Sequence, residues 1–280
     1  MRRPEPPLAG VMGWPVAHSL SPRLHSFWLD RAAIAGTYVA LPVSPDQLKI
    51  AVFALPALGF RGVNITIPHK ETVFGLLDRL DPLATRVAAV NLVSIDERGR
   101  LFGQNSDVYG FRAHLLASAP DFQPSTAPAV ILGAGGAARA IAVALLDLGV
   151  PRLTLVNRNL SRAEALAEAL SDDRVEVAGW ADRSALLKQA GLLVNATSLG
   201  MTGQPVLDIH LSLMLPGGVV FDSVYTPLQT PLLAEAERRG LIPVDGLGML
   251  IHQAVPSFEA FFGVQPQPDA TSRAHLVAAL

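Results

Sequence analysis

AVILGAGGAA, at residues 129–138, is the stretch that decides the fold. Its first four residues are apolar and predict a buried strand. Gly133, Gly135 and Ala138 then follow at the spacing G-x-G-x-x-G/A of dinucleotide-binding turns. The first glycine permits a sharp turn, the second lets a pyrophosphate approach the backbone, and Ala138 lets a helix pack closely on the strand.

The residues after this turn extend the same pattern. A helix is predicted over 137–148, with Gly149 as its stop and with free N–H groups at its start that favour an anion. A second strand is predicted over 153–156, and it leads into Asn157-Arg158. An NAD site usually has a carboxylate there, whereas Arg158, with Arg162 in the next helix, would attract the 2′-phosphate of NADP. Ser161 and Glu164 are interpreted as a capping box for that helix.

Length and composition limit the number of domains and the kinds of partner that the chain can have. The 280 residues suit two modest domains or one large one, and a net charge of −2 gives no indication of a nucleic-acid partner. There is no cysteine, and the seven histidines show no metal-ligand spacing, so no metal is expected. Met1-Arg2-Arg3 is followed by prolines instead of an apolar segment, and no run is long enough to span a bilayer. We therefore expect no membrane association and a cytoplasmic location.

The rest of the chain predicts an α/β protein. Strands over 10–14, 38–43 and 62–67 alternate with helices that begin at Ser21 and Pro45, as in a βαβ array. Residues 120–128 resemble a linker. Further strands are predicted over 192–196, 219–224 and 241–244, with a helix over 231–239 and a long helical segment from Gly246 that Pro256 should kink.

Polar residues of the first half suggest a ligand site. Ser21 is predicted to cap a helix with Pro22 at its first position, and Ser19 and Ser21 could also cradle a carboxylate. Asn64 and Thr66 share one face of a predicted strand, and Lys70 follows that strand, where ligands of α/β sheets collect. Simple capping and a solvated lysine are the plainer interpretations. Asn91 and Asp107, taken alone, are typical of turns.

Over nearly its whole length the sequence resembles the shikimate dehydrogenase family. Each shared motif is short, but the occurrence of all of them in this order is specific to the family. The motifs are Gly13–Pro22, Gly62–Lys70, Ala89–Asn91, Gly103–Asp107, Gly133–Ala138, Asn157-Arg158, Asn195–Met201 and Asp245–Ala254. There are departures: Ser106 stands where the family commonly has Thr, Asn159 where Thr often follows, Ser26 where Asn is frequent, and Phe261-Phe262 where a Trp is usual.

The resemblance implies two domains: an N-terminal α/β substrate domain (1–112 plus 247–280) and a Rossmann-type doubly wound NADP(H)-binding domain (113–246). It implies a catalytic pair, Lys70 and Asp107. It implies that the substrate, shikimate or 3-dehydroshikimate, contacts Ser19, Ser21, Asn64, Thr66, Lys70, Asn91, Asp107, Tyr225 and Gln253. The cofactor residues are then Gly133, Ala134, Gly135, Gly136, Ala137, Ala138, Asn157, Arg158, Arg162, Thr197, Val224, Gly246 and Met249.

The activity implied is NADP-dependent reduction of 3-dehydroshikimate to shikimate, in the biosynthesis of chorismate and aromatic amino acids. Two alternatives stay open: a quinate/shikimate dehydrogenase with relaxed cofactor use, and a non-catalytic NADP-binding regulator on the same fold. The sequence does not fix the oligomeric state, so a homodimer is also open.

Overall fold

The computed structural model describes residues 6–280 and divides into two compact units. The first unit contains the chain up to Ser106 together with Gln253–Ala279, and the second contains Asp107–His252 with Leu280. Met1-Arg2-Arg3 lies outside the described residues. Each unit has its own six-stranded sheet and is described by itself.

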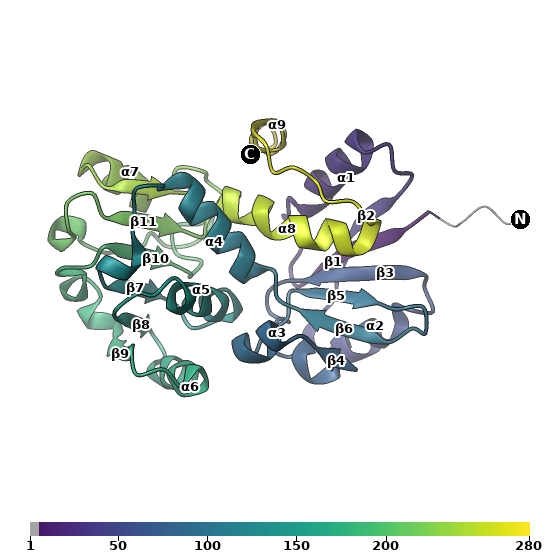
Figure 1. Cartoon of the computed structure of the whole chain (residues 1–280), viewed down its shortest axis with the longest axis horizontal. Helices are drawn as coiled ribbons and strands as arrows, with labels where there is room; N and C mark the ends of the chain where they lie inside the picture. Colours follow the sequence, from purple (N-terminus) through teal and green to yellow (C-terminus); the bar gives the residue numbers. More distant parts are fainter. Residues whose placement is uncertain (1–5) are drawn as a thin grey trace, which may run out of the picture. The chain divides into compact units, whose positions relative to one another are not determined.

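The sheet of the second unit is entirely parallel, in the order β12-β11-β10-β7-β8-β9 (Figure 1). The chain starts in the middle at β7, adds β8 and β9 on one side, and resumes with β10 on the other. This doubly wound order places the change of direction between β7 and β10, where such sheets bind ligands. The strands are β7 (Ala129–Leu132), β8 (Leu153–Asn157), β9 (Val175–Gly179), β10 (Leu192–Asn195), β11 (Val219–Asp222) and β12 (Ile242–Val244).

Helix α5 (Gly136–Asp147) is buried around most of its circumference. Every residue from Ala140 to Leu146 is buried, because the helix contacts β7 and β8 of the sheet and also α4 (Asp107–Ser118). Gly149, with φ of +82°, follows the C-cap residue Leu148. The predicted helix and its glycine stop are therefore confirmed. The other helices of this unit are α6 (Leu160–Leu170), α7 (Pro231–Arg238), the first half of α8 (Gly246–Phe262), and the short turns Pro124–Thr126, Trp180–Asp182, Ala185–Leu187 and Leu211–Leu213.

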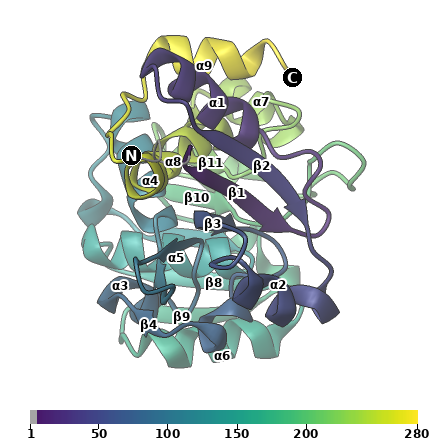
Figure 2. The same cartoon turned by 90° about the vertical axis from the view of Figure 1, so that its right-hand side faces the viewer.

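The sheet of the first unit is mixed, in the order β2-β1-β3-β5-β6-β4. The three predicted strands are present as β1, β2 and β3, which pair in parallel and lie side by side in Figure 2. β5 is antiparallel to β3, and β6 is antiparallel to β5; neither was predicted. The strands are β1 (Leu8–Gly13), β2 (Thr37–Pro42), β3 (Phe60–Ile65), β4 (Arg79–Leu80), β5 (Leu92–Ile95) and β6 (Leu101–Gln104).

Helix α1 (Ser21–Arg31) of the first unit packs against the C-terminal helix α9 (Ala270–Val277) (Figure 2). Trp28 Nε1 donates a hydrogen bond to Ser272 Oγ at 2.9 Å, and Arg31 forms an ion pair with Asp269 at 2.8 Å. These contacts fasten the end of the chain to its beginning. The remaining helices are α2 (Leu48–Ala54), α3 (Pro82–Val87), the second half of α8, and the short turns Pro45–Gln47 and Val73–Leu76.

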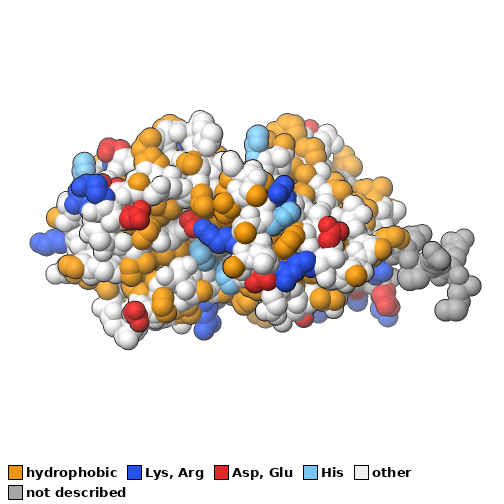
Figure 3. Space-filling model, turned by 90° about the horizontal axis from the view of Figure 1, so that it is seen from above, with side chains coloured by type: hydrophobic (Ala, Val, Ile, Leu, Met, Phe, Trp, Pro, Cys, Tyr) orange, Lys and Arg blue, Asp and Glu red, His pale blue; other side chains and the backbone are white. Residues whose placement is uncertain are grey.

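The surface carries charges of both signs. On the face drawn in Figure 3, basic and acidic side chains are scattered, and neither forms a continuous patch. Among residues 6–280, no helix combines the length and the apolar character that crossing a bilayer requires.

Candidate active site

Gly133 forms the turn at the end of β7. Its φ is +115°, a conformation that side chains disfavour, and a Cβ there would lie 2.9 Å from the backbone oxygen of Ala196. The turn therefore passes directly against the segment that follows β10. The sharp turn predicted from the first glycine is confirmed, and it lies at the change of strand order.

Gly135 has a different reason to be glycine. Its φ of −94° is ordinary, and a Cβ built on it would meet no described atom within 4 Å. Gly135 is also the N-cap of α5, and no side chain caps that end of the helix. Open space thus lies beside N–H groups that favour an anion. These residues fit the pyrophosphate of a dinucleotide.

The end of β8 carries the predicted cations. Arg158 directly follows Asn157, the last residue of β8, and its side chain is exposed. Arg162 lies in the first turn of α6. The predicted capping box is wrong: α6 begins at Leu160 with Asn159 as its N-cap, so Ser161 is inside the helix. Ser161 Oγ instead donates to Asn159 Oδ1 at 2.6 Å.

The ends of β10 and β11 are joined by a buried carboxyl group that the sequence did not single out. Asp222 is fully buried and accepts hydrogen bonds from Asn195 Nδ2 at 2.9 Å, from Val224 N at 3.1 Å and from Thr230 Oγ1 at 2.7 Å. Burial raises the pKa of Asp222 to about 6, against the opposing effect of these donors. Its place at the carboxyl end of a buried strand was the available signal.

The neighbouring segments hold the remaining predicted cofactor residues. Thr197 donates to Asn195 Oδ1 at 2.7 Å, and Gly246 N donates to the oxygen of Val224 at 3.3 Å. A Cβ on Gly246 would lie 2.3 Å from Ser223 O, so only glycine fits beneath this backbone. Met249 is buried in α8, and burial raises the pKa of Tyr225, which keeps its hydroxyl protonated as a donor.

In the first unit, the directions of the strands bring several residues to the same edge of the sheet, the one at which β1 and β3 end. β1 and β3 end there, the antiparallel β5 begins there, and β6 ends there, since Leu92 pairs with both Asn64 and Gln104. Thr66 follows β3, Asn91 precedes β5, and Ser106 follows β6. The unpredicted antiparallel strands are thus the reason that residues far apart in sequence share this edge.

Ser19 and Ser21 follow β1, and the predicted N-cap is wrong. Helix α1 begins at Ser21, its N-cap is Leu20, and Ser19 Oγ accepts a hydrogen bond from Ser21 N at 3.3 Å. Ser21 is 7% exposed, and its hydroxyl makes no hydrogen bond with residues 6–280. Its hydroxyl therefore remains available to a ligand beside the helix start.

Asn64 is held more firmly than the sequence suggested. Its Nδ2 donates to Asn91 O at 3.0 Å and to Ser257 Oγ at 2.7 Å, and its Oδ1 accepts from Tyr38 Oη at 2.8 Å. Both N–H groups of the amide are used, so only Oδ1 has a lone pair left for a ligand hydroxyl. Thr66 is half-buried, and its hydroxyl makes no hydrogen bond with the described residues.

Asn91, Ser106 and Gln253 form a hydrogen-bonded cluster at this edge. Asn91 Nδ2 donates to Ser106 Oγ at 3.0 Å and to Gln253 Oε1 at 3.3 Å, while Ser106 N donates to Asn91 Oδ1 at 2.7 Å. The serine at the position where the family commonly has threonine therefore supplies the hydroxyl that fixes Asn91.

Lys70 and Asp107 are placed by separate backbone features. The backbone oxygen of Lys70 accepts a hydrogen bond from Val90 N at 2.8 Å. This bond holds the backbone of Lys70 beside the segment that leads into Asn91. Asp107 is 4% exposed and opens helix α4, immediately after Ser106. Both residues have further interactions within the protein.

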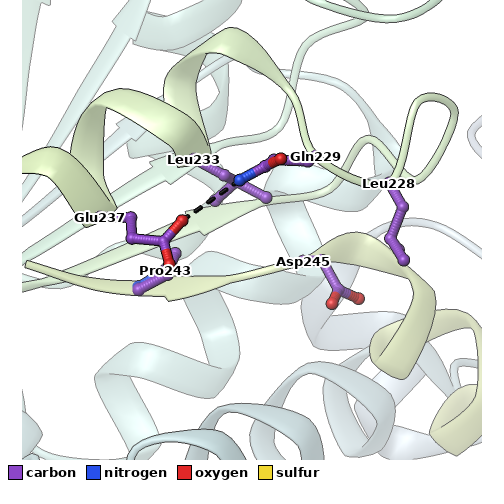
Figure 4. Close-up of a pocket in the computed structure, with 6 residues that line it drawn as sticks. All are labelled: Leu228, Gln229, Leu233, Glu237, Pro243 and Asp245. Carbon is purple, nitrogen blue, oxygen red and sulfur yellow. Dashed lines mark hydrogen bonds between the residues drawn. The ribbon is translucent and has the colours of Figure 1, made fainter.

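The second unit has a pocket of about 240 Å³, and no residue of the glycine turn lines it (Figure 4). Leu228, Gln229, Leu233, Glu237, Pro243 and Asp245 line it. Gln229 Nε2 donates to Glu237 Oε2 across it at 3.2 Å. None of these six residues was predicted to bind a ligand. Within residues 6–280, no group of three or more His, Asp and Glu residues could hold a metal ion.

Family models match most of the chain. The model of the shikimate dehydrogenase substrate binding domain matches residues 11–93, that of shikimate/quinate 5-dehydrogenase matches 117–202, and that of the shikimate 5′-dehydrogenase C-terminal domain matches 246–274. A relative named shikimate dehydrogenase (NADP(+)), from Rhodospirillum rubrum, is 53% identical over 95% of this chain and 95% of its own length.

Two solved structures are similar throughout. The shikimate 5-dehydrogenase of Thermus thermophilus in complex with NADP(H) and shikimate is 37% identical with a TM-score of 0.87, covering 98% of this chain and 100% of that one. The quinate dehydrogenase of Corynebacterium glutamicum in complex with NAD is 33% identical with a TM-score of 0.88, covering 97% and 99%.

Proposed function

Because this chain belongs to the shikimate dehydrogenase family, we propose that it catalyses the reversible, NADP-dependent reduction of 3-dehydroshikimate to shikimate. The observation that carries the proposal is the polar edge of the first unit's sheet. It offers the amide cluster of Asn91, Ser106 and Gln253 and the hydroxyl of Thr66, and Ser21 after β1 adds a second hydroxyl without a hydrogen bond to the described residues. A small acid with several hydroxyl groups is the ligand that such a set fits.

We assign the substrate carboxylate to Ser19 and Ser21. Neutral hydroxyls donate hydrogen bonds to a carboxylate without placing a charge of their own beside it. We assign the ring hydroxyls to Asn64, Thr66, Asn91, Asp107 and Gln253, and we propose Tyr225 as a further substrate contact. Asn64 can serve only as an acceptor, since both of its N–H groups are used inside the protein.

The reacting centre is assigned to Lys70 and Asp107. When bound, NADPH supplies a hydride to the substrate ketone, and the oxygen of that ketone gains negative charge. The Lys70 ammonium, hydrogen-bonded to this oxygen, stabilises the charge and delivers a proton. Asp107 orients the ammonium and, in the reverse direction, the reacting hydroxyl.

The cofactor is assigned to the second unit. The turn from Gly133 to Ala138 and the open start of α5 hold the pyrophosphate, and Arg158 with Asn157 and Arg162 holds the 2′-phosphate. Thr197, Val224, Gly246 and Met249 line the nicotinamide end. In functional terms we assign substrate binding to residues 1–112 with 247–280 and cofactor binding to 113–246.

We propose the cytoplasm as the compartment of this protein. A homodimer is the assembly to test beside the monomer, and light scattering at several concentrations measures the mass in solution. The similarity to a quinate dehydrogenase structure favours one alternative activity, that of a quinate dehydrogenase. This alternative differs from the proposed activity in its substrate, and the similar structure contains NAD.

Steady-state kinetics with shikimate and with quinate, each with NADP and with NAD, test the proposal. We expect the highest kcat/KM for shikimate with NADP. A higher value for quinate, or for NAD, would contradict the assignment. Binding of NADP without turnover of either substrate would instead indicate the non-catalytic regulator.

A further inference from the structure

The buried carboxyl of Asp222 connects three segments of the second unit. It lies at the carboxyl end of β11, beside Asn195 at the end of β10, because these two residues pair in the parallel sheet. It accepts one hydrogen bond from the end of β10, one from the backbone after β11, and one from the start of α7. A single side chain therefore ties three chain segments together at this edge.

The first connection organises the segment after β10. Asn195 Nδ2 donates both to Asp222 Oδ1 at 2.9 Å and to the oxygen of Leu199 at 3.0 Å. Its Oδ1 accepts from the backbone and the hydroxyl of Thr197 at 3.1 and 2.7 Å. The orientation of this amide, and with it the position of Thr197, depends on the acceptor that Asp222 provides.

The other two connections hold the segment 223–230. Val224 N donates to Asp222 Oδ1 at 3.1 Å, and the oxygen of Val224 accepts from Gly246 N at 3.3 Å. Thr230 Oγ1 donates to Asp222 Oδ2 at 2.7 Å and also accepts from Leu233 N at 3.3 Å as the N-cap of α7. The segment between Val224 and Thr230, which contains Tyr225, is thus held at both of its ends by one carboxyl group.

A carboxyl group in this place is unfavourable for the fold itself. Asp222 is fully buried, and among residues 6–280 its hydrogen-bond partners are an amide, a backbone N–H and a hydroxyl, all uncharged. Burial of a charge without an opposite charge costs free energy that an apolar residue of similar size avoids. The residue therefore calls for a reason besides stability.

On the basis of the proposed function, we propose that Asp222 is a positioning residue for the nicotinamide half of the cofactor. It acts through Thr197 and Val224, two residues assigned to that half, and none of its hydrogen-bond partners among residues 6–280 belongs to the residues assigned to the pyrophosphate or the 2′-phosphate. Loss of its connections should therefore weaken the whole cofactor and spare a fragment that lacks nicotinamide.

Binding of two ligands tests this role: NADPH, followed by its fluorescence, and 2′,5′-ADP, followed by calorimetry. Thr230→Val removes the hydroxyl at nearly constant shape. We expect it to raise the Kd of NADPH about tenfold, since a hydrogen bond to a charged group is lost, and to leave the Kd of 2′,5′-ADP within about twofold. Thr230→Ser, which keeps the hydroxyl, should restore NADPH binding. Asp222→Asn, which keeps one acceptor oxygen, should show the same selectivity as Thr230→Val.

Thr154→Val is the matched control. Thr154 is a buried threonine of the same sheet, 5% exposed, and its hydroxyl makes no hydrogen bond with the described residues. This variant should leave both Kd values within about twofold. The proposal is overturned if Thr230→Val and Asp222→Asn both bind NADPH like the unaltered protein, or if they weaken both ligands equally. Failure of the unaltered protein to bind NADPH would overturn the proposed function, which is a separate outcome.

Discussion

Arg158 is the residue on which cofactor choice depends. It is exposed directly after β8, where a carboxylate would repel a 2′-phosphate. Arg158→Ala should therefore raise the KM for NADP by about tenfold or more, because a charge-assisted contact is lost, and leave the KM for NAD within about twofold. Kinetics with both cofactors measure this. Arg152→Ala, an exposed arginine just before the same strand, should change neither value. Equal changes for the two cofactors would remove Arg158 from the phosphate site.

Lys70 is the residue on which the proposed chemistry depends. An ammonium that stabilises developing charge acts more strongly in the transition state than in the ground state. Lys70→Ala and Lys70→Met should therefore lower kcat by roughly 10²–10⁴-fold and change the KM for shikimate much less. Steady-state kinetics across pH, with circular dichroism to check folding, measure the effect. Lys49→Met, on the exposed side of α2, is the control. A kcat within about threefold of the unaltered protein would show that Lys70 has a binding or surface role.

Single residues differed in how well sequence predicted them. Gly133 was interpreted correctly because its need for positive φ is a property of the local turn. Asp222 was missed because it lay inside the predicted strand 219–224 with no motif around it, and its burial depends on the pairing of β11 with β10, more than 20 residues earlier. The three hydrogen bonds of Asn64 were missed for the same reason: Tyr38, Asn91 and Ser257 reach it from separate elements.

At the scale of elements, the contact between α4 and α8 gives a stability prediction. A Cβ on Gly248 would lie 2.0 Å from Cε1 of His114. That ring cannot easily move, since Nε2 bonds to the oxygen of Asp245 at 2.9 Å and Nδ1 to Ser118 Oγ at 3.2 Å. Gly248→Ala should therefore destabilise the protein by about 1–3 kcal/mol through overpacking. Urea unfolding measures the change.

Gly179→Ala is the control for that experiment. The nearest atom to its added Cβ would be Asp182 Oδ2 at 3.5 Å, an ordinary contact. We expect a change within about 0.5 kcal/mol, as for substitutions that disturb no special feature. Similar unfolding curves for the two variants would show that the ring of His114 moves aside at little cost.

Elements were predicted best where a local pattern was sufficient. The strand–turn–helix unit around residue 133 has its signals within 20 consecutive residues, and its bounds agree to within one residue. β5 and β6 have four residues each and take their place only by pairing: β5 pairs with β3, more than 25 residues earlier, and β6 pairs with β5 and β4. The start of α1 was misplaced because Ser-Pro fits a helix in two registers, and Ser19 Oγ supplies the partner that favours the observed one.

At the scale of the whole molecule, the buried carboxyl of Asp222 gives stability a specific pH dependence. Its pKa is about 6 in the folded protein, whereas an aspartate in an unfolded chain titrates near pH 3.9, about two units lower. The folded state therefore binds this proton more tightly. The resulting stabilisation is complete below about pH 4 and is lost as the pH rises through about 6.

The prediction compares the unaltered protein with Asp222→Asn at pH 5 and pH 7. The free energy of unfolding of the unaltered protein, taken relative to that of the variant, should be about 1 kcal/mol higher at pH 5 than at pH 7. Urea unfolding at both values measures it. Other groups titrate in the opposite sense, and Asp269 is one, because the backbone N–H of Ser272 is the chief cause that lowers its pKa. These groups are common to both proteins, so their contributions cancel in the difference. The same difference at both pH values would show that Asp222 titrates as in the unfolded chain.

The fold class was predictable for the whole molecule because βαβ alternation recurs along the sequence and the glycine turn marks the second unit. The sheet order was not, since the return from β9 to β10 depends on packing and on no local signal. The polar edge of the first unit was predicted as a set of residues from the family resemblance, while its geometry depends on the antiparallel strands that no motif announced.

Gly133 and Gly135 are two positions apart, yet they would be lost for different reasons over evolutionary time. Gly133 is required by the backbone, so every descendant that keeps this fold must keep it. Gly135 has a common φ and open space beside it, so only use of the cofactor would preserve it. A lineage that abandoned catalysis would drift at the second glycine first. Among related genomes, the pair can therefore separate working enzymes from retired copies before any assay is run.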